Sequence, residues 1–111
     1  MTNWEMYQGE RMEIVDKIGF DEILLQLAEE ASELSQAALK LRRARMGINP
    51  TPVTCEKAQL HLLEEIADVM VCVGSADFDS AMINYINTLT LKKLKRWKKR
   101  LGIDKEKEDE D

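Results

Sequence analysis

The sequence predicts an all-α protein, a bundle of four helices, and three observations support this. Apolar residues recur three and four positions apart over long stretches, as they do in helices with one apolar face. No stretch alternates apolar and polar residues for long enough to indicate a strand. Only 5% of the residues are aromatic and 33% are charged, a balance typical of helical bundles with an aliphatic core. At this length we expect one domain, formed by residues 1–103.

A glycine separates the first two predicted helices. Residues 3–18 carry apolar side chains at helical spacing, and Gly19 ends that segment. Asp21 is a candidate N-cap for a second helix, which runs from Glu22 to about Met46 and contains few helix breakers. This second helix is the longest one that the sequence predicts.

The clearest loop is the stretch Gly-Ile-Asn-Pro-Thr-Pro at 47–52. A third helix begins near Thr51 or Thr54, since Pro52 is tolerated in a first turn, and it ends near Ser75. Asp79 is a plausible N-cap for a fourth helix, which Gly102 stops.

Charge, apolar runs and cysteine positions indicate which partners and which compartment to expect. The charged tail, 104–111, is expected to be disordered, and the net charge of −5 disfavours stable binding to nucleic acid. The longest apolar run, Val69 to Val73, is far shorter than the ~20 residues that span a membrane, and we find no signal peptide. Cys55 and Cys72 lie about 25 Å apart on one predicted helix, so they cannot pair. We expect a reduced, cytoplasmic protein with no membrane association.

Two clusters of carboxylates, at 29–33 and 64–68, lie inside the second and third helices. Glu30 and Glu33 are three residues apart and leave the same helix face, and Glu65 and Asp68 repeat that spacing. Each pair borders the apolar stripe of its helix. We therefore expect antiparallel packing of the two helices to bring the pairs face to face.

Such a cluster needs cations or protons, because four carboxylates near an interior repel one another and lose hydration worth several kcal/mol each. All the ligand atoms are hard oxygens, which predicts Mg²⁺, with Mn²⁺ as a substitute. A di-iron centre is disfavoured, since the single histidine, His61, forms His-x-x-x-Glu with no second copy. His61 shares the acid stripe, which allows a hydrogen bond to one of these acids, but we interpret it as an ordinary packed or half-exposed residue. A single acid pair of this kind more often belongs to a solvated helix face. Here the same spacing occurs on two helices, and this repetition favours a metal site.

A basic run occupies seven of the nine positions from 92 to 100. Lys93, Arg96 and Arg100 share one helix face and are candidates for binding phosphate oxygens. The alternative is a solvated helix end whose positive charges suit the C-terminal dipole.

Taken together, these motifs resemble the MazG-like all-α nucleoside triphosphate pyrophosphohydrolases. That family carries EExxE on one helix, ExxD on the next and a basic stretch on the last, and the resemblance covers about residues 20–101. It implies a hydrolase of phosphoric anhydride bonds with the all-α pyrophosphatase type of four-helix fold. It also implies Mg²⁺-dependent cleavage of a (deoxy)nucleoside triphosphate to monophosphate and pyrophosphate, for house-cleaning or control of the nucleotide pool.

Carried over by motif position, the resemblance implies metal ligands and one further acid. The ligands are Glu30, Glu33, Glu65 and Asp68, and Glu29 is an additional acid near a metal or the attacking water. Two other functions stay open: phosphoribosyl-ATP pyrophosphohydrolase, and a non-catalytic helical interaction module.

The resemblance further implies a homodimer or homotetramer. Apolar residues on a second side of the two long helices indicate the same: Leu24, Leu25, Leu39, Leu63 and Met70.

Overall fold

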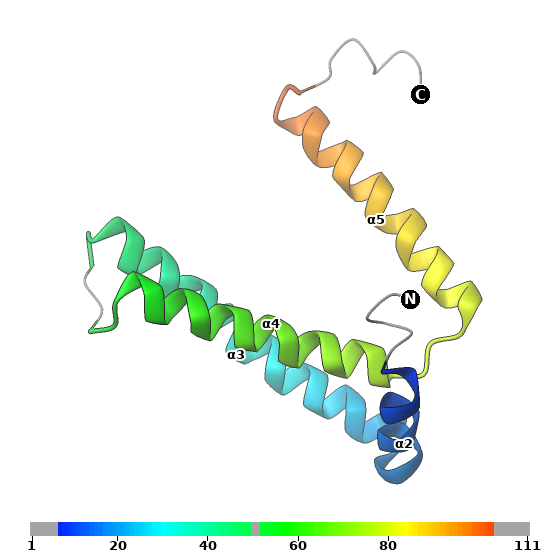
Figure 1. The fold of residues 1–111 in the computed structure, drawn as a ribbon. Coiled ribbons are helices and arrows are strands. Elements are labelled where there is room, and N and C mark those ends of the chain that lie inside the picture. The colour runs from blue at the N-terminus through cyan, green and yellow to red at the C-terminus, as the bar shows by residue number, and fades with distance from the viewer. Residues whose placement is uncertain (1–6, 50–51, 104–111) are drawn as a thin grey trace. The chain divides into compact units, whose positions relative to one another are not determined.

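The computed structural model describes residues 7–49 and 52–103, and it confirms the all-α prediction (Figure 1). These residues form four helices and no strand: α2 (Gln8–Ile18), α3 (Phe20–Met46), α4 (Cys55–Ser75) and α5 (Ser80–Arg100). The predicted tail and the first four residues of the first predicted helix lie outside the described residues, as does Thr51. The chain divides into two compact units, Met1–Asp77 and Phe78–Asp111, so α5 is described by itself.

Helix α3 begins two residues earlier than predicted, and Asp21 is not its N-cap. Gly19 ends α2 and also caps α3, with a φ of 87° that glycine adopts without strain. Its N–H donates to the Val15 carbonyl at 2.8 Å, and its own carbonyl accepts from the Ile23 N–H at 3.2 Å. Because one residue completes the turn, Asp21 falls in the first turn of α3, where its charge suits the helix dipole.

The predicted start of α4 near Thr54 and the predicted cap of α5 at Asp79 are both confirmed. The Thr54 hydroxyl accepts a hydrogen bond from the Lys57 N–H at 3.2 Å, and the Asp79 carboxylate accepts one from the Met82 N–H at 2.8 Å. Helix α4 ends at Ser75, as predicted. These caps form because each side-chain oxygen takes a backbone donor that the first helical turn leaves unpaired.

Helices α3 and α4 lie side by side and run antiparallel, and α2 packs across the end where α3 begins and α4 stops (Figure 1). Near the other end, the Cys55 thiol donates to the Ala44 carbonyl at 3.2 Å. Cys55 and Cys72 are both free and both lie on α4, as predicted.

The contact between α3 and α4 is a narrow seam of residues spaced alternately four and three apart. On α3 the sheltered residues with this spacing are Ile23, Leu27, Glu30, Leu34, Ala37, Leu41 and Ala44, and Lys40 is also half-buried. On α4 they are Ala58, Leu62, Glu65, Val69 and Cys72, followed by Ala76 at the C-cap of the helix. This is the spacing by which two helices pack along one another in coiled coils. We call these residues the seam.

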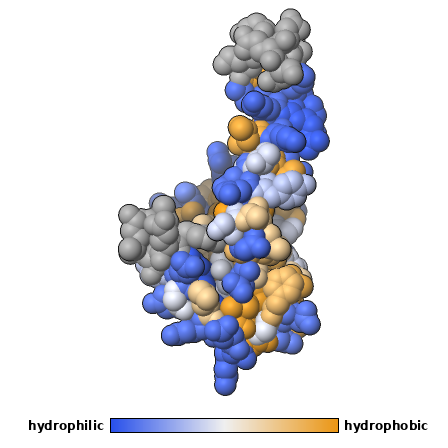
Figure 2. Space-filling view, turned by 90° about the vertical axis from the view of Figure 1, so that its right-hand side faces the viewer, coloured by the Kyte–Doolittle hydropathy of each residue, from blue (hydrophilic) through white to orange (hydrophobic). Residues whose placement is uncertain are grey.

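The seam buries little apolar material. Among the described residues, the buried apolar side chains are Ile23, Ala37, Ala58, Cys72 and Ala76, and none of the large ones is fully buried. Several large apolar side chains of α3 and α4 are instead 53% to 57% exposed: Leu25, Leu39, Leu63, Met70 and Val71. Apolar residues accordingly reach the surface among polar ones in the space-filling view (Figure 2). A membrane span is not found among the described helices, since none is both long and apolar enough.

Candidate metal centre

Glu30 and Glu65 occupy positions inside the seam. The sequence placed all four acids at the border of an apolar stripe, but the spacing of the sheltered residues puts one glutamate of each helix where an apolar side chain would otherwise pack. Glu65 is only 7% exposed, and Glu30 is half-buried. Glu33 and Asp68, their partners three residues on, are exposed at the edge of the seam. Each motif therefore contributes one inner and one outer carboxylate.

The antiparallel packing brings three of the four acids together, as expected. Carboxylate oxygens of Glu30, Glu33 and Glu65 all lie within 4.8 Å of one another. One ion can contact oxygens at these separations after small side-chain rotations, since Mg²⁺ and Mn²⁺ bind carboxylate oxygens at about 2.0–2.2 Å. The donors come from two helices, so the seam sets their separation.

The other two predicted acids, Asp68 and Glu29, do not belong to this group of three. Asp68 is not in the three-residue group, but it lies close enough to raise the pKa of Glu30. Glu29 is exposed on α3 and is not in the group. The structure thus places Asp68 beside the cluster, while the predicted role of Glu29 stays a prediction.

Each inner glutamate has one oxygen engaged by a neighbour on its own helix. The Gln26 amide Nε2 donates to Glu30 Oε1 at 2.9 Å, and His61 Nε2 lies 3.2 Å from Glu65 Oε1. The other oxygen of each, Oε2, is buried and has no hydrogen-bond partner. Buried acceptors of this kind are rare, because the lost hydration is not compensated.

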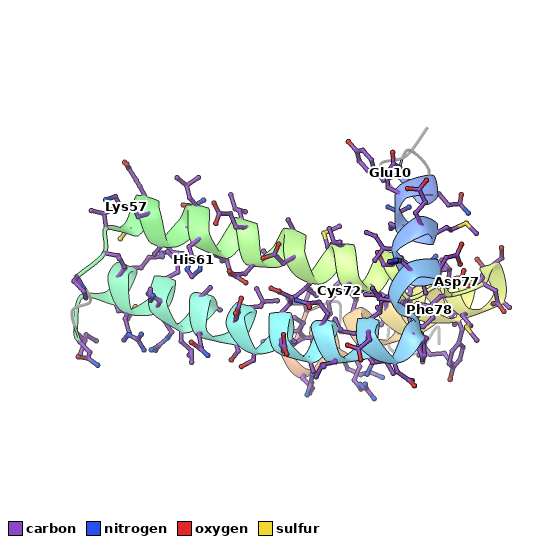
Figure 3. The ribbon with its side chains drawn as sticks, turned by 90° about the horizontal axis from the view of Figure 1, so that it is seen from below. Glu10, Lys57, His61, Cys72, Asp77 and Phe78 are labelled. Carbon is purple, nitrogen blue, oxygen red and sulfur yellow. The ribbon has the colours of Figure 1, made fainter. Side chains whose placement is uncertain are left out.

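The contact of His61 with Glu65 corresponds to the less favoured of the two interpretations that the sequence allowed. Its side chain is 43% exposed, in agreement with the half-exposed position that we expected. Figure 3 shows the His61 side chain on the side of α4 that faces α3. Gln26 was missed entirely. The available signal was its position four residues before Glu30, a spacing at which amide and carboxylate side chains meet on a helix.

The surroundings of the cluster disfavour the negatively charged forms of Glu30 and Cys72. Burial raises the pKa of Glu30, and the nearby charges of Asp68 and Glu33 raise it further, against the lowering effect of the Gln26 hydrogen bond. Burial likewise raises the pKa of the Cys72 thiol, with Glu30 and Asp68 adding to the shift. Negative charge gathered at this point of the seam is stabilised by a proton or a cation.

The donor set fits a hard divalent cation. The three grouped ligands are all carboxylates, and two of them have a buried oxygen with no partner. Mg²⁺ and Mn²⁺ prefer such oxygens, and binding either ion would remove both the repulsion and the unpaired acceptors. A half-open cavity of about 470 Å³ lies farther along the seam and does not include these acids; its walls are Leu41, Arg45, Cys55, Gln59, Leu62 and Leu63.

The three predicted phosphate-binding residues belong to α5. Lys93, Arg96 and Arg100 are exposed along that helix, in the second unit of the chain. Their role in binding substrate stays a prediction.

Comparison with known proteins gives no match for this chain, whether with family models, with curated proteins or with solved structures.

Proposed function

We propose that this protein is a Mg²⁺-dependent nucleoside triphosphate pyrophosphohydrolase, which cleaves a (deoxy)nucleoside triphosphate to the monophosphate and pyrophosphate. The observation that carries the proposal is the pair of inner glutamates, Glu30 and Glu65, each with a buried oxygen that has no partner. A helical protein gains stability from apolar residues at such positions, so two facing carboxylates indicate a function that needs them. The resemblance of the acid motifs to MazG-like enzymes supports the same reaction.

The residues of the chain have distinct roles in this proposal. Glu30, Glu33, Glu65 and Asp68 would hold the ion. An ion held there would supply positive charge to the triphosphate oxygens. In the reaction a water forms a new bond to phosphorus, the bridging P–O bond breaks, and pyrophosphate leaves with the bond's electrons. Glu29, next to Glu30 on α3, is the candidate acceptor for the water's proton.

Two alternatives make different demands on the same residues. A phosphoribosyl-ATP pyrophosphohydrolase would use the same acids on another substrate. A non-catalytic interaction module would need its carboxylates at the surface, where a partner can reach them. The burial of Glu65 argues against the module, because a carboxylate that is only 7% exposed offers little to a docking protein.

The test is release of pyrophosphate from a panel of nucleotides, including phosphoribosyl-ATP, with and without Mg²⁺. We expect Mg²⁺-dependent release from one or more nucleoside triphosphates. Release from phosphoribosyl-ATP alone would favour the first alternative, and release from none of them would favour the interaction module.

Amide variants link the activity to the cluster. Glu30→Gln, Glu33→Gln, Glu65→Gln and Asp68→Asn should each abolish hydrolysis while the helical circular dichroism stays unchanged. The control is Glu56→Gln, an exposed acid in the first turn of α4, which should keep full activity. If Glu65→Gln lost helicity but still bound metal as wild type does, the acids would be structural and the site misassigned.

A further inference from the structure

We propose that Gln26 and His61 are positioning residues, which hold Glu30 and Glu65 in the seam so that one oxygen of each is ready for a divalent cation. This inference rests on the cation site of the proposed function, and it does not depend on which substrate is cleaved. It assigns the two residues no contact with the ion or the substrate.

The two contacts have the same construction. Each donor lies four residues before its glutamate on the same helix, and each is within hydrogen-bonding distance of Oε1. In both cases Oε2 is left buried and without a partner. The coincidence matters because Glu30 and Glu65 are the two inner acids, whereas the outer acids Glu33 and Asp68 are exposed.

Antiparallel packing places the two donors on opposite sides of the glutamate pair. Gln26 lies toward the start of α3, and His61 lies toward the start of α4, which is the other end of the seam. Gln26 therefore holds Glu30 from one side of the pair, and His61 holds Glu65 from the opposite side. The two unpaired oxygens remain for a ligand between the helices.

The atoms that face the two glutamates hold them without competing for the cation. The Gln26 amide nitrogen has no lone pair to offer, and the His61 nitrogen that faces Glu65 is occupied by that contact. Glutamate has three rotatable bonds, so an inner carboxylate without its donor is free to swing out of the seam, away from the repulsion of its neighbours. Contacts of this kind orient metal ligands, and losing one commonly weakens metal affinity about 10–100-fold.

The experiment is a calorimetric titration of the full chain with Mn²⁺ alone, without nucleotide. We expect Gln26→Ala and His61→Ala each to bind Mn²⁺ about 10–100-fold more weakly than the wild-type chain. Matched controls are Gln36→Ala on α3 and Gln59→Ala on α4, both exposed, which should bind as wild type does. Helical circular dichroism checks that every variant is folded.

A rescue variant distinguishes positioning from a merely structural role. His61→Gln places at position 61 the same side chain that position 26 already uses, at the same spacing from its glutamate. Mn²⁺ affinity should then return close to that of the wild-type chain. If His61→Gln binds as weakly as His61→Ala, the positioning role of His61 is overturned.

The remaining outcomes separate this inference from the proposed function. Wild-type affinity in both alanine variants would overturn the positioning roles and leave the cation site standing. A wild-type chain that binds no Mn²⁺ would overturn the site and this inference together. Mn²⁺ binding that weakens as expected, in a protein that cleaves no nucleotide, would support the inference and overturn only the hydrolase.

Discussion

Glu30 and Glu65 place carboxylates where the spacing of their helices otherwise brings apolar side chains into the seam. In the metal-free protein this arrangement is unfavourable, because burial and the charges of neighbouring acids act against ionisation. For Glu30 the consequence is a raised pKa, caused first by burial and then by Asp68 and Glu33. Stability and metal binding therefore make opposite demands on the same residue.

The raised pKa of Glu30 predicts how pH affects the metal-free protein. A carboxyl group with a higher pKa in the folded than in the unfolded chain binds its proton more tightly when folded. The free energy of unfolding then falls as pH rises from the unfolded pKa through the folded one, and it stays lower above that window. Glu30→Gln removes this loss, so in EDTA it should melt at a higher temperature than wild type at about pH 7.

The difference in melting temperature should shrink as pH is lowered below about 4, because the wild-type carboxyl group then becomes protonated in both states. Added Mn²⁺ should raise the melting temperature of the wild-type chain much more than that of the variant. An equal or lower melting temperature for Glu30→Gln at neutral pH would contradict the prediction. Glu56→Gln serves again as the control.

At the scale of the helices, two alanines occupy buried positions in the seam between α3 and α4. Ala37 is 1% exposed and Ala58 is 2% exposed, so neither position has room for a larger side chain. The separation of the helices in turn sets the separation of the carboxylates that they carry. Packing and metal binding are therefore coupled through the seam.

Ala37→Leu should weaken both properties. The larger side chain pushes the helices apart, which should cost about 1–3 kcal/mol of stability, and it moves the α3 carboxylates away from Glu65. We expect a lower midpoint in urea and weaker Mn²⁺ binding. Ala38→Leu is the matched control, since Ala38 is the next residue and is exposed. A destabilised variant with wild-type Mn²⁺ affinity would show that the seam does not set the ligand geometry.

Helix α5 is strongly basic near its end, and its predicted role is to bind phosphate. Arg96 can offer a forked pair of donors to phosphate oxygens, which lysine cannot. If the prediction holds, Arg96→Ala should raise KM for the triphosphate about tenfold or more, and Arg96→Lys should recover only part of the loss. Wild-type steady-state kinetics in Arg96→Ala would leave the basic run as a solvated helix end.

At the scale of the whole molecule, the described helices leave many large apolar side chains exposed. Leu25 and Leu39 of α3 and Leu63 and Met70 of α4 are each more than half exposed. Exposed apolar side chains in this number are typical of surfaces that another chain covers. We therefore propose that the protein acts as a homodimer or homotetramer.

Sedimentation equilibrium at micromolar concentration tests this proposal. We expect a mass of at least twice 12.8 kDa, and we expect Leu39→Lys with Leu63→Lys to shift the equilibrium toward the monomer. Glu13→Lys, a charge change at an exposed position of α2, is the control. A single species near 12.8 kDa that still cleaves nucleotide would overturn the proposal.

The sequence by itself determined the features that depend on neighbours along the chain. Helical periodicity predicted the all-α class, and Asp79 was recognisable as a cap because a cap needs only its own first turn. The N-cap predicted at Asp21 was wrong for an equally local reason, since Gly19 with a positive φ ends one helix and begins the next. The spacing of the acids also showed that each pair shares one face.

Only the tertiary structure decided which acid of each pair enters the seam. Residues three apart share a face, but the seam between two helices is only about one residue wide at each turn. The docking of α4 on α3 puts Glu30 and Glu65 inside and leaves Glu33 and Asp68 at the edge. A carboxylate oxygen stays hydrated only if the other helix does not cover it. The unpaired oxygens of Glu30 and Glu65 could therefore not be predicted from the sequence of either helix alone.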